Sequence, residues 1–207
     1  MHAPEPPADC PLCPRLVTYR HANRLGNPEW HNAPVQGFGD PAAWLLILGL
    51  APGRTGANRT GRPFTGDSAG SLLEATLIAA GLATPQENGT LHLHRTFITN
   101  AVRCAPPGNK PTPAEVHACR PFLLGTLEAL PAARTIVALG QIAHQSAIKA
   151  CGGKLPKHPF AHGAVHRLYT GYTVLDSFHP SQLNTNTGRL TPEMLTAVFA
   201  QALSAQP

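Results

Sequence analysis

The sequence has little charge, few aromatic side chains and no long apolar run. Only 13% of its 207 residues are charged and 6% are aromatic, whereas 43% are hydrophobic. That apolar share supports a core of ordinary size. No stretch approaches the roughly 18 consecutive apolar residues of a transmembrane helix, so we expect no membrane partner. The first ten residues, MHAPEPPADC, lack the apolar segment of a signal peptide, and we therefore expect a cytoplasmic protein.

Acidic side chains and lysines are also scarce. Lys and Arg total 16 against 11 Asp and Glu, which gives a net charge of +5. Most of the basic residues are arginines, whose planar guanidinium binds phosphate through two hydrogen bonds. The surplus is a weak indication of a polyanionic partner such as nucleic acid, since many unrelated domains are equally basic.

Length and hydrophobic patterning predict one α/β domain over residues 1–207, with the proline-rich residues 1–9 disordered. Apolar runs alternate with helical patterns, which is typical of a doubly wound, mainly parallel sheet. Capping residues mark three helix starts: Ser71 with Glu74, Thr112 with Glu115, and Thr191. The expected strands are 44–50, 96–102, 135–139, 165–169 and 172–177, and the expected helices are 15–25, 71–82, 113–130, 141–151 and 192–203.

The chain is organised around the stretch LLILGLAPGRTGANRTGRPFTGDSAG, residues 45–70. It begins as a buried strand and continues as a long loop with five glycines and two prolines. Such a loop between a strand and a helix builds ligand sites in α/β proteins, although it could also be a plain surface loop with a helix cap. It matches neither the Walker pattern nor the dinucleotide-binding pattern, which argues against a nucleotide cofactor.

Three loops at predicted strand ends contain Phe64, Asp67, Asn100 and His179. The carboxyl ends of parallel strands meet at one edge of a sheet, so we expect these side chains to converge. An aromatic ring can stack on a flat heterocycle, an amide can bind its polar edge, and an imidazole can stabilise negative charge on an oxygen. Each residue also has a structural explanation, as core ring, helix N-cap, turn former or strand end.

Five cysteines in a chain of this kind argue against a disulfide framework. Cys10 and Cys13 form a C-x-x-C pair, whereas fourteen residues separate Cys104 from Cys119. Thiolate quartets bind zinc or an iron–sulfur cluster, and the split second pair modestly favours the cluster. Cys151 is expected to be a core residue.

Six motifs together resemble those of the uracil-DNA glycosylase superfamily, and most of all its fifth family, the type-b iron–sulfur branch. They are GLAPG, GRPFTGDSAG, TNAVRCAPPGNKPTP, CRPFL, VALG and HPSQLNTNTGRLT. The resemblance implies a three-layer fold with a central four-stranded, mainly parallel sheet. It also implies a monofunctional DNA glycosylase that flips out and excises uracil, and other deaminated bases such as hypoxanthine or xanthine, at the start of base excision repair.

The resemblance also implies residue roles. Phe64 would stack on the flipped base, Asn100 would read its edge, and His179 would contact the oxygen that gains charge. Ala51 occupies a base-binding position where other branches have an Asp or Asn that orients water, and Asp67 would take over that role. Cys10, Cys13, Cys104 and Cys119 would hold a structural [4Fe–4S] cluster, with zinc or free thiols as the alternative.

The resemblance implies DNA as the binding partner, and we expect the protein to be a monomer. The segment after His179 would supply a wedge and phosphate contacts. The alternatives are a strict uracil-DNA glycosylase of the related iron–sulfur branch, which usually has an acidic residue in place of Leu50, and a non-catalytic DNA-binding module with a metal staple. The expected DNA contacts are Arg62, Ser181, Gln182, Leu183, Asn184 and Arg189.

Overall fold

A six-stranded sheet forms the centre of the protein, in a computed structural model that describes residues 5–87 and 89–205. Its order is β1-β5-β2-β6-β8-β7, and the four central strands are parallel. The α/β prediction is confirmed. Two short antiparallel edge strands flank the four strands that the resemblance implied; of these two, the sequence predicted the strand at 165–169 but not the one at Phe38–Gly39. The strands are β1 (Phe38–Gly39), β2 (Leu45–Gly49), β5 (Thr96–Asn100), β6 (Thr135–Leu139), β7 (Val165–Arg167) and β8 (Thr173–Ser177).

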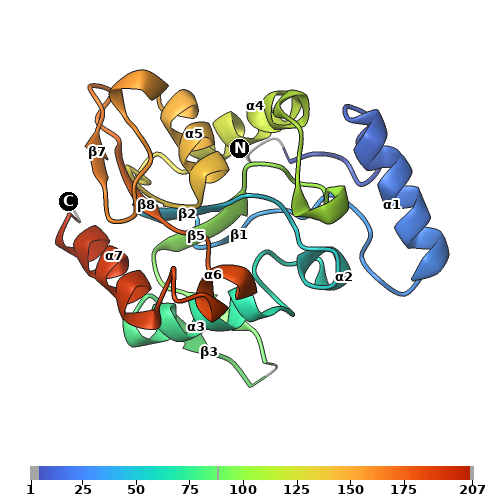
Figure 1. Ribbon diagram of the computed structural model, residues 1–207, viewed down its shortest axis with the longest axis horizontal. Coiled ribbons are helices and arrows are strands. Elements are labelled where there is room, and N and C mark those ends of the chain that lie inside the picture. The colour runs from blue at the N-terminus through green and yellow to red at the C-terminus, as the bar shows by residue number, and fades with distance from the viewer. Residues whose placement is uncertain (1–4, 88, 206–207) are drawn as a thin grey trace.

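Helices cover both faces of the sheet because its central strands are buried on both faces. All five residues of β2 and of β6 are buried. Successive side chains of β2 point to opposite faces, so Leu45 and Ile47 join one hydrophobic cluster while Leu46 and Leu48 join the other. Figure 1 shows α3 (Ser68–Ala79) and α7 (Pro192–Ser204) on one side, and α4 (Pro113–Ala129) and α5 (Gln141–Ala150) on the other.

The helix starts confirm two of the three expected caps. Thr112 and Glu115 form a reciprocal capping box on α4, and Thr191 caps α7. For α3 the prediction was wrong: the helix begins three residues before Ser71, and Asp67 is its N-cap. The sequence misled because Gly70 is typical of a loop. In the structure this glycine is required in the first turn, since a Cβ there would collide with the backbone carbonyl of Phe64.

The N-terminal segment leads into α1 (Pro14–Gly26), at the right of Figure 1. Disorder was predicted for residues 1–9, and residues 1–4 of that segment lie outside the described residues. Residues 5–9 instead make ion pairs: Glu5 lies 3.5 Å from Arg103, and Asp9 lies 2.6 Å from Arg24. None of the helices formed by the described residues is long and apolar enough to cross a membrane.

Besides β1, six short elements were not predicted, because each is too short to show a hydrophobic period. They are α2 (Ala57–Thr60), β3 (Ala83–Pro85), β4 (Leu91–Leu93), the 3-10 helices η1 (Pro107–Asn109) and η2 (Leu155–Lys157), and α6 (Gln182–Asn186). The last of them, α6, lies next to the carboxyl edge of the sheet, where the parallel register aligns Gly49 with Asn100 and Leu139 with Ser177.

Candidate active site

Phe64 and Asn100 meet over the last residue of β2. A Cβ built on Gly49 would lie 2.3 Å from the Asn100 Oδ1 atom and 2.6 Å from the edge of the Phe64 ring. Any side chain at Gly49 would therefore displace both. A glycine inside a strand indicates such a close approach, and this signal was available in the sequence.

The backbone of Phe64 is held in an uncommon conformation. Its φ of +51° lies in the left-handed region, which a bulky aromatic residue rarely adopts. Close packing of its carbonyl against Gly70 accompanies this conformation. Strained residues of this kind persist where the surrounding structure fixes them and concentrate at functional sites. The half-buried ring is thus fixed at the sheet edge, where it also packs against the hydrophobic cluster that contains Leu45 and Ile47.

Asn100 presents an amide that has no hydrogen-bond partner among the described residues. The residue as a whole is only 2% exposed. Its amide atoms are not among the fully buried unpaired atoms, so they reach solvent and are free to bind a ligand or water. The alternative explanation of Asn100 as a turn former does not hold, because Asn100 is the last residue of β5.

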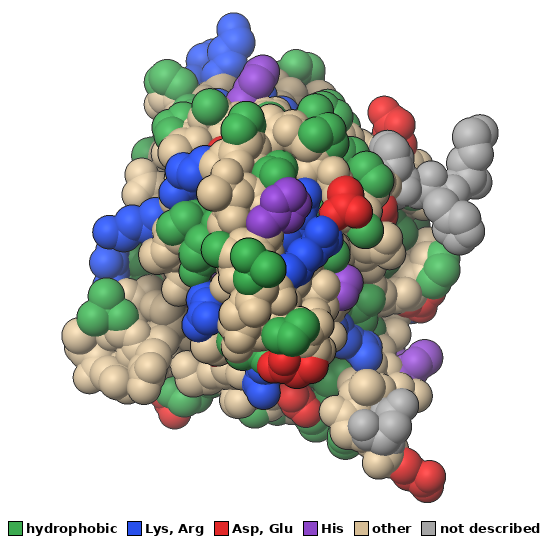
Figure 2. Space-filling model, turned by 90° about the vertical axis from the view of Figure 1, so that its right-hand side faces the viewer, with side chains coloured by type: hydrophobic (Ala, Val, Ile, Leu, Met, Phe, Trp, Pro, Cys, Tyr) green, Lys and Arg blue, Asp and Glu red, His purple; other side chains and the backbone are tan. Residues whose placement is uncertain are grey.

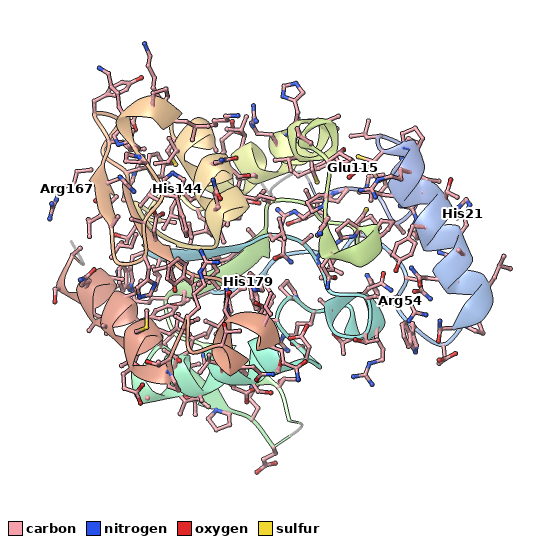
Figure 3. The ribbon with its side chains drawn as sticks, viewed as in Figure 1. His21, Arg54, Glu115, His144, Arg167 and His179 are labelled. Carbon is pink, nitrogen blue, oxygen red and sulfur yellow. The ribbon has the colours of Figure 1, made fainter. Side chains whose placement is uncertain are left out.

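His179 lies two residues beyond β8, with its ring centroid 6.1 Å from that of Phe64. Its backbone carbonyl accepts a 2.8 Å hydrogen bond from the amide of Asn184 on α6, and in Figure 3 it lies between the sheet and α6. Desolvation lowers the pKa of His179, while the nearby Asp67 carboxylate acts in the opposite direction. The imidazole is therefore neutral at neutral pH and can donate a hydrogen bond from one ring nitrogen.

Asp67 uses one carboxylate oxygen as a cap and leaves the other facing the glycine-rich loop. Oδ1 accepts a 2.9 Å hydrogen bond from the Gly70 N–H. Oδ2 would lie 3.1 Å from a Cβ on Gly53 and 2.3 Å from a Cβ on Gly56, so both glycines are needed for its approach. The structural explanation of Asp67 as an N-cap is thus correct, and it leaves one oxygen available. Ala51, by contrast, directs its methyl group to the cluster of Leu16, Val102 and Cys119.

The expected DNA-contact residues fall into two groups. Gln182, Leu183 and Arg189 are exposed around α6, and the Leu183 side chain is 73% exposed. Others are already engaged within the protein: Ser181 caps α6, and Asn184 binds the His179 carbonyl.

Arg62 is also engaged, because it stacks on Phe38 at 3.9 Å and donates to the Leu91 carbonyl. The guanidinium of Arg189 lies 4.5 Å from the centroid of the Phe178 ring. Figure 2 shows basic side chains over the middle of the face that carries α1 and α2.

The four cysteines Cys10, Cys13, Cys104 and Cys119 line one small cavity between α1, the loop after β5 and α4. Burial raises the pKa of Cys104 to about 12 and that of Cys119 to about 11, so these thiols stay protonated unless a metal binds them.

Two buried arginines, Arg20 and Arg103, border the same cavity, and no pattern in the sequence indicated a role for them there. Arg20 Nη1 lies 3.8 Å from the Cys104 sulfur, and the backbone N–H of Arg103 donates to the Cys119 sulfur at 3.3 Å. Polar N–H groups directed at sulfur are suited to a bound thiolate.

The fold and these side chains define an α/β enzyme whose site suits a planar heterocycle at the carboxyl edge of a parallel sheet. A family model, the Uracil DNA glycosylase superfamily, matches residues 36–203. The chain therefore belongs to the uracil DNA glycosylase superfamily, a group of DNA N-glycosylases, and the resemblance inferred from the motifs is confirmed.

Curated relatives match over most of their length. The type-5 uracil-DNA glycosylase of Thermus thermophilus is 48% identical over 203 residues, which cover 93% of this chain and 92% of that protein. The type-5 enzyme of Mycobacterium tuberculosis is 45% identical over 206 residues, covering 93% and 76%. That of Pyrobaculum aerophilum is 40% identical over 202 residues, covering 94% and 88%.

Proposed function

We propose that this protein is a monofunctional DNA glycosylase that excises uracil and other deaminated bases from DNA. The observation that carries the proposal is the convergence of Phe64, Asn100, His179 and Asp67 at one edge of the sheet. A base inside a duplex cannot reach such a site, so the enzyme must extrude it. The names of the type-5 relatives support uracil as a substrate.

The neutral side of the site would hold the base. The Phe64 ring stacks on it, which is worth roughly 1–3 kcal/mol for a base on an aromatic ring. The unpartnered amide of Asn100 offers one donor and one acceptor side by side. As the N-glycosidic bond breaks, negative charge develops on the base, and a hydrogen bond from neutral His179 stabilises it on an oxygen.

The carboxylate side would meet the sugar. The sugar gains oxocarbenium character, and the second oxygen of Asp67 stabilises this positive charge or orients the attacking water. Ala51 has no group for either task. The four lysines lie at the end of η1, on α5 and around η2, so a Schiff-base lyase reaction is not expected.

The range of bases follows from the edge that Asn100 reads. Uracil, hypoxanthine and xanthine all present a carbonyl next to a ring N–H. The Asn100 amide can donate to that carbonyl and accept from that N–H in each base, because no other described residue orients it. The relatives are named only for uracil, so hypoxanthine and xanthine belong to our proposal. A strict uracil enzyme would reject both purines.

The test is a strand-cleavage assay. Duplexes with a single uracil, hypoxanthine or xanthine are incubated with the protein, and the abasic sites are cleaved by alkali. We expect release of all three bases. Cleavage of the uracil strand alone would support the strict alternative, and duplex binding without any abasic site would identify a non-catalytic module.

We also propose that the cysteine quartet holds a structural [4Fe–4S] cluster. A single zinc ion with Zn–S bonds of about 2.3 Å draws four thiolates to within roughly 4 Å of one another. In the described residues, the one group of metal-binding side chains with ligand atoms within 4.8 Å is His144, His166 and Asp176, not the quartet. The wider spacing, the small cavity and the N–H groups directed at sulfur favour the larger cluster. Once bound, it would link the N-terminal segment to the loop after β5 and to α4.

Leu183 is the proposed wedge, because its apolar side chain is 73% exposed on α6 beside the site. Leu183→Ala is expected to slow uracil release from a U·A pair more than from a U·G mismatch, since extrusion is harder where pairing is stronger. Single-turnover rates on the two duplexes measure this. Leu25→Ala, which removes an 87% exposed leucine at the end of α1, is the matched control and should change neither rate. Equal losses on both duplexes for Leu183→Ala would contradict the wedge role.

A further inference from the structure

A network of buried hydrogen bonds attaches residues 158–163 to β8. Asp176 is fully buried, with Oδ1 2.8 Å from His144 Nδ1 and Oδ2 2.9 Å from His166 Nε2. The other ring nitrogen of His144 lies 2.9 Å from the His158 carbonyl oxygen. An oxygen atom thus faces each ring nitrogen of His144, one from Asp176 and one from the backbone of His158. Figure 3 shows His144 on α5.

Backbone hydrogen bonds extend this anchor along the segment. The Ala161 N–H donates to Asp176 Oδ2 at 3.4 Å, and the Gly163 N–H donates to the Asp176 carbonyl at 2.8 Å. The hydrogen bonds of the three side chains explain their burial without an ion. The segment is consequently held against the last residues of β8 from both sides of His162.

The anchored segment directs His162 at the residue that precedes His179. His162 Nδ1 accepts a 3.1 Å hydrogen bond from the Phe178 N–H, and the two rings stack at 5.0 Å with an interplanar angle of 18°. Desolvation lowers the pKa of His162, which keeps Nδ1 free of a proton and able to accept.

We propose that His162 is a positioning residue for His179, acting through the Phe178 N–H. Two side chains then fix the backbone around His179: His162 holds the N–H of Phe178, and Asn184 holds the carbonyl of His179. The inference rests on the proposed function, because it assigns His162 to the group that would stabilise the departing base. A displacement of about 1 Å at a reacting group can cost 10²-fold in rate, so a small backbone shift at His179 is sufficient to matter.

Two substitutions separate the hydrogen bond from the ring stacking. His162→Phe keeps a flat ring but removes the acceptor, whereas His162→Asn removes the ring and keeps an oxygen near the position of Nδ1. His162→Phe is expected to lower the single-turnover rate of uracil release about 10-fold without weakening duplex binding. His162→Asn should keep the wild-type rate. If the Phe variant is not stable, His162→Gln, whose polar groups lie further out, should show the same loss.

Hydrogen exchange at the Phe178 amide supplies a readout besides activity. Exchange should be faster in His162→Phe than in the wild type and slow again in His162→Asn. His179→Ala serves as the reference for loss of the imidazole. A wild-type rate in His162→Phe, or an equal loss in His162→Asn, while His179→Ala is slow, would overturn the inference and leave the proposed function intact. If the wild-type protein releases no uracil, the proposed function fails instead.

Discussion

Asp67→Asn is expected to slow uracil release by roughly 10²-fold or more in single-turnover assays, within the range for acid–base and electrostatic groups. The substitution removes the negative charge of Oδ2, the oxygen that faces Gly53 and Gly56. It keeps an oxygen that can accept the Gly70 N–H, and Asn is as good an N-cap as Asp. The melting temperature and the affinity for duplex DNA should therefore barely change.

The same variant should alter the titration of His179. The Asp67 carboxylate favours the imidazolium form of this histidine, so its removal should lower the His179 pKa further. NMR titration of the ring can measure this shift. A lower His179 pKa in the variant would establish that the Asp67 carboxylate and the His179 imidazole interact electrostatically, and this readout does not depend on the reaction rate.

Asp40→Asn is the matched control for Asp67→Asn. Like Asp67, Asp40 accepts backbone N–H groups, but it does so with both carboxylate oxygens, from Ala42 at 2.8 Å and Arg95 at 3.0 Å. It is not part of the four-residue site. Its substitution should leave the rate unchanged. Near-native uracil release by Asp67→Asn would show that stabilisation of the leaving base dominates and that the water needs no carboxylate.

Cys104→Ala is expected to remove the cluster and much of the stability. The wild-type protein should be brown, with broad visible absorption and about four irons per chain, and the variant should be colourless. Loss of the link between the N-terminal segment and the loop after β5 should cost roughly 3 kcal/mol or more. For a chain of this length that corresponds to a fall of about 6–12 °C in melting temperature.

Cys151→Ala controls for the loss of a buried thiol. Cys151 is 3% exposed, but it is the C-cap residue of α5 and packs in a hydrophobic cluster that contains none of the other four cysteines. This variant should stay brown, with iron content equal to that of the wild type. A colourless wild-type protein that contains one zinc would defeat the cluster proposal.

Hydrophobic period and capping chemistry already determined the main elements. The buried run of β2, the capping box of α4 and the Thr191 cap of α7 are local features, so they could be read without a partner. The same local information placed Phe64, Asn100 and His179 on segments at the ends of strands, and a parallel sheet brings such segments together. Motif resemblance then supplied the family, which the comparisons confirm.

Only the tertiary structure decided what each of these side chains does within the fold. It decided between two possible starts of α3: Asp67 accepts the Gly70 N–H as the cap, and the alternative start at Ser71 with Glu74 is not used. It turned Arg62 toward Phe38 and Asn184 toward the His179 carbonyl, so neither is a free surface group. It also brought His144, His166 and Asp176 together from α5, β7 and β8. Contacts between segments distant in the sequence depend on how the helices and loops pack on the sheet, and the order of residues does not specify that packing locally.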